Sequence, residues 1–189
     1  CNIINDNAFD GCELLSSIDL PVCSNIKYCA FRSCISLTTL NLPLCTNIGA
    51  YAFSSCTSLT SINLPLCTNI SAYAFSGCTS LTSINLSECI NISYYAFFGC
   101  TSLSSIYLPK AKTMTGTGIF DSCTSLSIAN LPICSYIGNN LFRNCTSLTS
   151  LILGYSGVAQ LANTNAFAST PMSISTLTGT FGSIYVPAS

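Results

Sequence analysis

A cysteine recurs every eleven residues along most of this chain, and that spacing constrains the fold more than any other feature of the sequence. The series runs without a gap from Cys12 to Cys100, meets Ala111 in place of a cysteine, and resumes from Cys123 to Cys145. The flanking residues alternate between two patterns, so the true period is 22 residues, and the segments 34–55, 56–77 and 78–99 are nearly identical. A fixed period of this length predicts a solenoid, in which each coil packs only against its neighbours.

The first half of each repeat has the form C-x-x-L-x-x-I-x-L-P, which predicts a short β-strand. In the copy that begins at Cys56, Ile62 and Leu64 are separated by one residue, so they point to the same side of an extended chain. Leu59, Ile62 and Leu64 are therefore predicted to face the core. Pro65 is expected to end the strand, because proline has no N–H to donate to a sheet.

The second half of each repeat contains a phenylalanine at one fixed place, which predicts a stacked column of core rings on a short helical turn. Ile119 and Leu141 precede two of these rings, Phe120 and Phe142. In the other copies the ring follows an alanine, in the pairs Ala8-Phe9, Ala30-Phe31, Ala52-Phe53, Ala74-Phe75, Ala96-Phe97 and Ala166-Phe167.

Both cysteine columns are expected to face inward, where a free cysteine packs as a small hydrophobe and Ala111 is an acceptable replacement. Equivalent residues of stacked strands lie about 4.8 Å apart and point the same way, whereas a disulfide prefers a Cβ separation of ~3.8 Å. Reduced, packed thiols are therefore favoured. Two alternatives remain: isolated disulfides where the cysteine columns are distorted, near Ala111, and a metal ion bound along the cysteine columns. We expect Cys29 to be at least partly exposed, because it replaces an aromatic residue of later repeats: Tyr51, Tyr73 and Tyr95.

Composition argues against several classes of function. Only 6% of the residues are charged, against roughly 25% in a typical soluble domain, and the net charge is −1, so no basic patch for nucleic acid is expected. Histidine is absent, which removes the commonest general base and metal ligand, so we expect no enzyme, cofactor or metal. No apolar run approaches the ~20 residues of a spanning helix, so membrane insertion is not expected. The carboxylates are scattered; four could form a small acidic rim near the N-terminus, Asp6, Asp10, Glu13 and Asp19.

The recurring C-T-S-L-x-S-I-x-L-P and A-Y-A-F-x-x-C segments resemble the BspA-like leucine-rich repeat family over about residues 1–153. The resemblance implies a mainly β, right-handed leucine-rich repeat solenoid with a parallel sheet, short helical turns, about seven coils and a C-terminal cap. It also implies an extracellular, cell-surface or virion-surface protein that acts in adhesion rather than catalysis. Residues 154–189 are expected to form an irregular last coil and the start of the cap, with residues 183–187 restoring one strand. The solenoid repeats within 1–153 are expected to start at Cys12, Cys34, Cys56, Cys78, Cys100, Cys123 and Cys145.

Strand alternation places two columns of side chains on the outside of the solenoid. One column reads Ser17, Thr39, Ser61, Ser83, Ser105, Ile128 and Ser150. The other is the candidate ligand-binding strip: Asp19, Asn41, Asn63, Asn85, Tyr107, Asn130 and Ile152. A solvated face of mutually hydrogen-bonded Asn side chains is the structural alternative for the same residues.

The leading functional hypothesis is a binding or adhesion module for a protein or glycan on a host or cell surface. The first alternative is a structural spacer or filament subunit that associates end to end. A more distant alternative is ice binding by a regular threonine column, Thr57, Thr79, Thr101, Thr124 and Thr146. Function is expected first where the repeat is irregular, at residues 110–118 and after Cys145.

Overall fold

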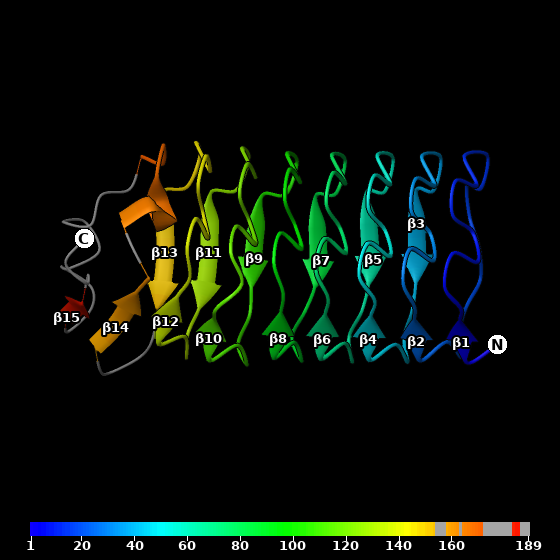
Figure 1. Ribbon diagram of the computed structural model, residues 1–189, viewed down its shortest axis with the longest axis horizontal. Helices are drawn as coiled ribbons and strands as arrows, with labels where there is room; N and C mark the ends of the chain where they lie inside the picture. Colours follow the sequence, from blue (N-terminus) through cyan, green and yellow to red (C-terminus); the bar gives the residue numbers. More distant parts are fainter. Residues whose placement is uncertain (154–157, 163, 172–182, 186–189) are drawn as a thin grey trace.

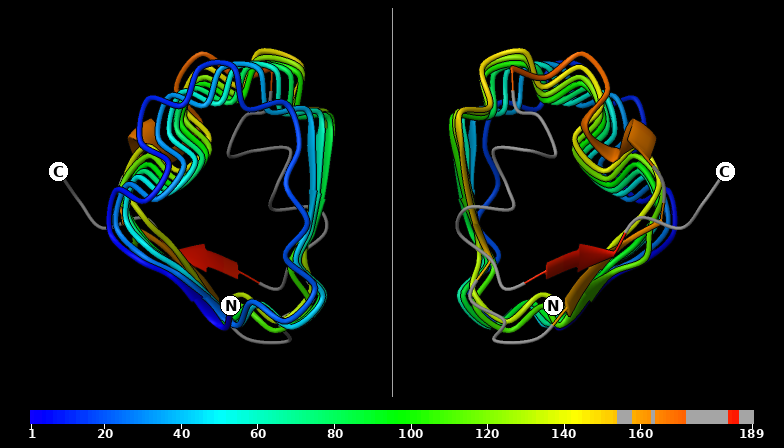
Figure 2. Two further views of the ribbon diagram at one scale, coloured as in Figure 1. Left: turned by 90° about the vertical axis from the view of Figure 1, so that its right-hand side faces the viewer. Right: turned by 90° about the vertical axis from the view of Figure 1, so that its left-hand side faces the viewer.

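The chain forms a β-solenoid whose coils stack in sequence order from the N-terminus to the C-terminus (Figure 1). This computed structural model describes residues 1–153, 158–162, 164–171 and 183–185. Viewed along the axis, the coil has a roughly triangular outline, in which two sides are β-walls and the third consists of turns (Figure 2). The prediction of a mainly β, parallel solenoid is confirmed.

The first wall is built largely from two-residue strands that contain the Asn-Ile pair of each repeat. Its strands are β1 (Ile3–Ile4), β2 (Asn25–Ile26), β4 (Asn47–Ile48), β6 (Asn69–Ile70), β8 (Asn91–Ile92), β10 (Thr113–Met114), β12 (Tyr136–Ile137), β14 (Val158–Leu161) and β15 (Ser183–Tyr185). All neighbouring pairs within each sheet of this wall are parallel.

The second wall carries the outward columns described above. Its strands are β3 (Thr39–Asn41), β5 (Ser61–Asn63), β7 (Ser83–Asn85), β9 (Ser105–Tyr107), β11 (Ile128–Leu131) and β13 (Ser150–Leu153). Leu40, Ile62 and Ile84 pair in register, so each strand repeats the inward and outward pattern of the one before it.

Both walls are interrupted at the same coil boundary. Strand β8 ends a five-stranded sheet and β10 begins a four-stranded one, while β7 and β9 likewise belong to separate three-stranded sheets. The boundary precedes the coil in which Ala111 replaces a cysteine and one residue is inserted. We call the interruption of the first wall, between β8 and β10, the seam.

The core contains the columns that the repeat pattern predicted. Leu59, Ile62 and Leu64 are buried, as are their equivalents in neighbouring coils, although Ile84 is only partly buried. Strand β5 ends at Asn63, two residues before Pro65. The phenylalanine rings are stacked along the axis, with centroids of successive rings 4.9 to 5.8 Å apart.

The expected helical turns are isolated hydrogen-bonded turns instead. The Phe53 N–H donates to the Ala74 carbonyl of the next coil at 2.8 Å, rather than to a carbonyl four residues back. Two residues per coil have left-handed backbone, such as Tyr73 (φ 57°) and Gly77 (φ 73°), and a left-handed residue ends a right-handed helix. Among the described residues only η1 (Thr164–Phe167) is a 3₁₀ helix.

The described part of the C-terminal region continues the solenoid. Strand β14 pairs with β12, β15 pairs with β14, and Phe167 stacks on Phe142. The expected strand at residues 183–187 is therefore present at Ser183–Tyr185. The rest of the expected last coil and cap, at residues 154–157, 163, 172–182 and 186–189, lies outside the described residues, and the domain boundary after 153 stays a prediction.

Candidate functional site

The second wall presents all of the strip residues to the outside, although Asn130 is partly buried and Asp19 lies before the first strand of the wall. The residues that alternate with them along the same strands, such as Leu40 and Ile62, face the core. The parallel register aligns Asn41, Asn63 and Asn85 directly, because each repeat has the same length. One face therefore gathers residues that are far apart in the sequence.

The N-terminal half of this face is polar and slightly hollow. A shallow hollow of about 330 Å³ lies over β3, β5 and β7 and is lined by every residue of the three strands. The Asn63 Nδ2 donates to Asn41 Oδ1 at 3.0 Å, while Asn85 Oδ1 accepts from the Ser87 N–H at 3.2 Å. The lining therefore offers hydroxyl, carboxamide and backbone groups without any charge.

The C-terminal half of the same face is apolar. Tyr107 is 53% exposed, and Ile128 and Ile152 are each 45% exposed. Asn130 lies between Tyr107 and Ile152 in the register of β9, β11 and β13. Its Oδ1 atom is buried and accepts no hydrogen bond from the described residues, which costs about 1–3 kcal/mol for a buried acceptor. Folding does not require these outward apolar groups, because Ser, Thr and Asn occupy the same positions elsewhere.

The asparagine pairs of both walls confirm that stacked Asn side chains bond to one another, but the ladders are not continuous. On the first wall Asn47 Nδ2 donates to Asn25 Oδ1 at 3.1 Å, and Asn91 Nδ2 donates to Asn69 Oδ1 at 2.8 Å. Asn69 Nδ2 turns instead to Thr68 Oγ1. The Asn side chains therefore support neighbouring coils in pairs.

The hydroxyl side chains have a structural role that the sequence reasoning missed. Thr60 Oγ1 donates to the Thr38 carbonyl at 3.1 Å, and Thr82 Oγ1 donates to the Thr60 carbonyl at 3.2 Å, one coil back each time. The column considered for ice binding does the same, at 3.3 to 3.5 Å, through Thr79, Thr101, Thr124 and Thr146. Each hydroxyl thereby joins two coils, which explains why a chain with so few charges carries so many Ser and Thr residues.

All fourteen cysteines are free thiols in this structure, and most are fully buried. In the first column the thiol donates to a phenylalanine carbonyl of the previous coil, as from Cys56 Sγ to Phe31 O at 3.0 Å. In the second column it donates to the carbonyl two residues on, as from Cys67 Sγ to Asn69 O at 3.4 Å. The cysteines are therefore both small core groups and hydrogen-bond donors. Only Cys1 and Cys12 are exposed.

Burial makes the packed thiols unreactive. It raises the pKa of Cys45 to about 11 and the pKa values of Cys56 and Cys67 to about 12. The thiolate is the nucleophile and the metal ligand, so these columns offer neither chemistry near neutral pH. Within the described residues no group of three or more His, Cys, Asp or Glu side chains is placed to hold a metal ion.

The expectation that Cys29 is partly exposed is wrong, since its exposed fraction is 0%. Cys29 has left-handed backbone like the tyrosines that replace it. The neighbouring Tyr28 fills the outer space in their place, because its ring meets Tyr51 edge-on at 6.0 Å. A hydrogen bond with Cys29 raises the pKa of the Tyr28 hydroxyl.

The three ion pairs of the described residues each join positions 22 apart: Asp10–Arg32, Glu88–Lys110 and Asp121–Arg143. In the expected acidic rim, Asp10 is paired in this way and Asp6 accepts the Tyr28 N–H at 3.0 Å. A spacing of one repeat between opposite charges was the signal that could have predicted these pairs.

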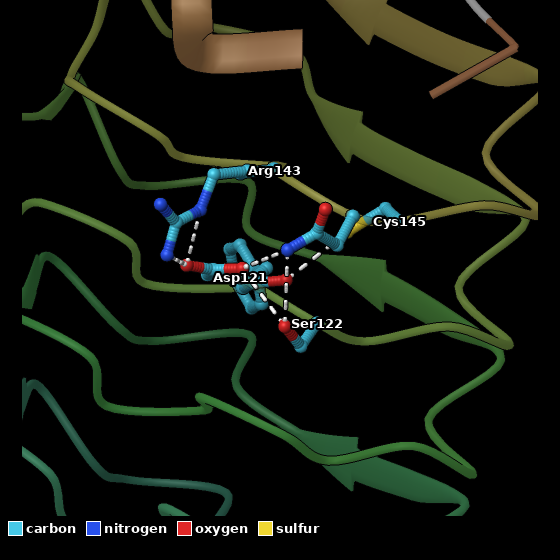
Figure 3. A network of polar contacts seen from close by, with 6 residues as sticks. Asp121, Ser122, Arg143 and Cys145 are labelled. Atoms are coloured by element: carbon cyan, nitrogen blue, oxygen red, sulfur yellow. Dashed lines mark hydrogen bonds and ion pairs between the residues drawn. The ribbon is translucent and has the colours of Figure 1, made fainter. Parts of the chain in front are cut away.

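Asp121 is the one fully buried charged residue in the described part of the chain. Its carboxylate accepts from Arg143 Nε at 2.8 Å, Ser122 Oγ at 2.9 Å and Asn144 Nδ2 at 3.2 Å (Figure 3). Both oxygens therefore have donors, and Asp121 is held as a structural group rather than as an available base. Sequence reasoning had treated it as one of several scattered carboxylates.

A parallel solenoid of 22-residue coils, with a leucine and phenylalanine core and an uncharged outward sheet, defines a leucine-rich repeat protein. The chain matches the model of the BspA type leucine rich repeat region, in six copies, over residues 1–90 and 68–187. It therefore belongs to the BspA-type leucine-rich repeat family. This family and this fold are typically non-enzymatic.

Solved structures support the same assignment. A leucine rich repeat protein of T. pallidum is 31% identical, with 77% of this chain and 70% of that chain covered and a TM-score of 0.68. A leucine-rich repeat protein from Bacteroides ovatus is 22% identical, with 90% and 50% covered and a TM-score of 0.56. The pneumococcal vaccine antigen PcpA is 14% identical, with 86% and 43% covered and a TM-score of 0.54.

At the identities of the latter two proteins the likeness concerns the fold alone, and the chain spans only half or less of their lengths. No curated protein sequence matches the chain. Within the ranges that the structure describes, the molecule contains no helix with the length and hydropathy of a membrane span.

Proposed function

We propose that this chain is a non-enzymatic binding module of a surface-associated, extracellular protein, and that the outward face of its second wall engages a protein or glycan ligand. The observation that carries this proposal is the apolar half of that face. Tyr107, Ile128 and Ile152 stand outward at positions where most other repeats place Ser, Thr or Asn. Exposed apolar groups gathered on one face of a solenoid are typical of an interaction site.

The polar half supports the proposal in a different way. The hollow over β3, β5 and β7 has hydroxyl and carboxamide groups at a regular spacing, which suit the hydroxyl groups of sugars or the backbone of a peptide. The buried Asn130 Oδ1, which lies within the apolar half between Tyr107 and Ile152, lacks a donor from the described residues, and a ligand that displaces its neighbours would supply one. Membership of the BspA-type family supports binding rather than catalysis.

A glycan and protein array screen of the chain, followed by affinity measurement on the best ligand, tests the proposal. The double substitution Tyr107→Asn and Ile152→Asn restores the residue that Asn41 and Asn63 provide in other repeats. Because buried aromatic anchors carry more than about 2 kcal/mol of binding energy, we expect the affinity to fall by roughly 30-fold.

A matched control removes an exposed aromatic residue elsewhere. Tyr94 is exposed on the turn side, and alanine occupies its position in two other repeats, as Ala50 and Ala72. Tyr94→Ala should leave the affinity within about twofold. The proposal fails if the array yields no ligand, or if the double substitution binds as tightly as the unsubstituted chain. Concentration-dependent fibres without any ligand would instead support the structural spacer.

A further inference from the structure

The seam in the first wall contains a second hollow, which the proposed binding face does not include. It has a volume of about 380 Å³ and is lined by Ile90, Asn91, Lys110, Lys112, Thr113 and Ile133. It lies where β8 and β10 belong to different sheets, so the hydrogen-bonded ladder of this wall does not close it. Three successive coils contribute its walls.

The hollow is made by departures from the repeat. Strands β2, β4, β6 and β8 each begin with Asn, whereas β10 begins with the shorter Thr113. Ile90 and Lys112 replace the Ser or Thr found in other coils, at Ser24, Thr46 and Thr68. These substitutions do not serve the core, because Cys89, Ala111 and Met114 fill it at this level.

The charges around the hollow leave one lysine without a carboxylate. Lys110 Nζ lies 2.5 Å from Glu88 Oε2, so the charge of Lys110 is already balanced. Lys112 is exposed and takes part in none of the ion pairs found among the described residues. The hollow therefore has an uncompensated positive charge in a chain with a net charge of −1.

The other residues that line the hollow indicate which groups a ligand would carry besides a negative charge. Ile90 and Ile133 are 47% and 38% exposed and offer apolar contact on either side of Lys112. Asn91 and Thr113 carry polar groups that can bond hydroxyls. A volume of about 380 Å³ is near the lower limit of small-molecule sites, so it suits one sugar ring rather than a long chain.

We propose that the seam hollow binds a carboxylate-bearing sugar residue. Its carboxylate pairs with Lys112, its hydroxyls bond Asn91 and Thr113, and its apolar substituent contacts Ile90 or Ile133. The site lies on the first wall and is independent of the face proposed above, so either proposal can fail without the other.

The test is a titration of the 189-residue chain with the methyl glycoside of N-acetylneuraminic acid, measured by calorimetry and by saturation-transfer NMR. The methyl ester of the same glycoside is the matched probe, since it differs only in lacking the negative charge. We expect saturable binding of the acid, at least tenfold weaker binding of the ester, and weaker binding of the acid as the salt concentration rises.

Substitutions locate the site. Lys112→Gln removes the charge and should weaken binding at least tenfold, whereas Lys27→Gln, at another exposed lysine outside the ion pairs, should change it less than twofold. Thr113→Asn restores the repeat and fills the hollow, so it should weaken binding to a similar extent as Lys112→Gln. Thermal unfolding of each variant confirms that the fold is kept.

Three results would overturn the proposal. The first is no saturable binding of the acid. The second is equal binding of acid and ester, or of the Lys112→Gln variant and the unsubstituted chain. The third is binding of cyclohexanecarboxylate as tight as that of the sugar acid, since a hydroxyl-free ligand would then satisfy the site and the sugar assignment would be wrong.

Discussion

Asp10 and Asp121 occupy the same place in their repeats, yet their surroundings differ. Each pairs with an arginine one coil further on, Asp10 with Arg32 and Asp121 with Arg143. The side chain of Asp10 is 23% exposed, whereas that of Asp121 is fully buried and also accepts hydrogen bonds from Ser122 and Asn144. A comparison of the two ion pairs therefore shows how burial changes the contribution of the carboxylate to stability, because the position in the repeat is the same.

Replacement of these carboxylates should have unequal effects. Asp121→Ala leaves a guanidinium and a carboxamide without their acceptor, and we expect it to lower the free energy of unfolding by about 2–3 kcal/mol. Asp10→Ala breaks a partly exposed ion pair and should cost less than about 1 kcal/mol. Urea unfolding of the two variants, followed by circular dichroism, gives both values. Equal losses would show that Asp121 does not depend on its buried contacts.

The phenylalanine column is the element with the most regular packing. Phe75 is fully buried, and its ring stacks on those of Phe53 and Phe97 at centroid distances of 5.3 and 5.2 Å. Offset stacking adds to the burial of apolar area. Each ring is in contact with the coil before and the coil after, so the column links neighbouring repeats rather than stabilising a single one.

Removal of one ring should therefore destabilise the solenoid strongly. We expect Phe75→Ala to cost ~3–5 kcal/mol in the free energy of unfolding, as usual for an emptied core aromatic site. Phe98→Ser provides the control, because Phe98 is partly exposed and serine occupies its position in two other repeats, as Ser54 and Ser76. Denaturant unfolding measures both. A loss below about 1 kcal/mol for Phe75→Ala would contradict a core role for the column.

The sequence predicts the elements of this fold well where the period alone decides them. Strand positions, the inward leucines and the phenylalanine column all follow from a 22-residue register, and so does the alignment of Asn41 with Asn63. The short helical turns expected from the sequence are isolated hydrogen-bonded turns in the structure, and a left-handed tyrosine such as Tyr73 cannot be recognised from composition. Cys29 is buried, and it is the ring of Tyr28 that meets Tyr51, an arrangement that the periodic pattern does not predict.

The two candidate sites, the strip on the second wall and the seam hollow, also differ in how far the sequence predicts them. The strip on the second wall was predicted residue by residue because alternation decides which side chains point outward. Its two halves, polar and apolar, are visible in the sequence as well. The repeat pattern does not predict the seam hollow, although it indicates that residues 110–118 are irregular. It arises from missing pairing between β8 and β10 and from the short side chain of Thr113, which are properties of packing between coils.

At the scale of the whole molecule, the thiol columns couple stability to alkaline pH. Burial raises the pKa of Cys34 and Cys45 to about 11 and the pKa of most other buried thiols further, from an ordinary value of 9.0. Above pH 9 the unfolded chain releases protons that the folded chain retains. The free energy of unfolding is therefore unaffected by these thiols below the ordinary thiol pKa and falls as the pH rises toward 11–12.

We expect urea unfolding midpoints that are constant from pH 7 to about 8 and that decline steeply above pH 9, since each buried thiol contributes up to about 1.4 kcal/mol per pH unit. Thiol titration at neutral pH should detect Cys1 and Cys12 in the folded chain and all fourteen cysteines in denaturant. A variant with Cys56→Ala, Cys78→Ala and Cys100→Ala keeps the tyrosines and lysines but should show a shallower decline, which separates the thiols from the other groups that titrate in this range. An identical decline in the variant, or none in the unsubstituted chain, would show that the columns do not govern alkaline stability.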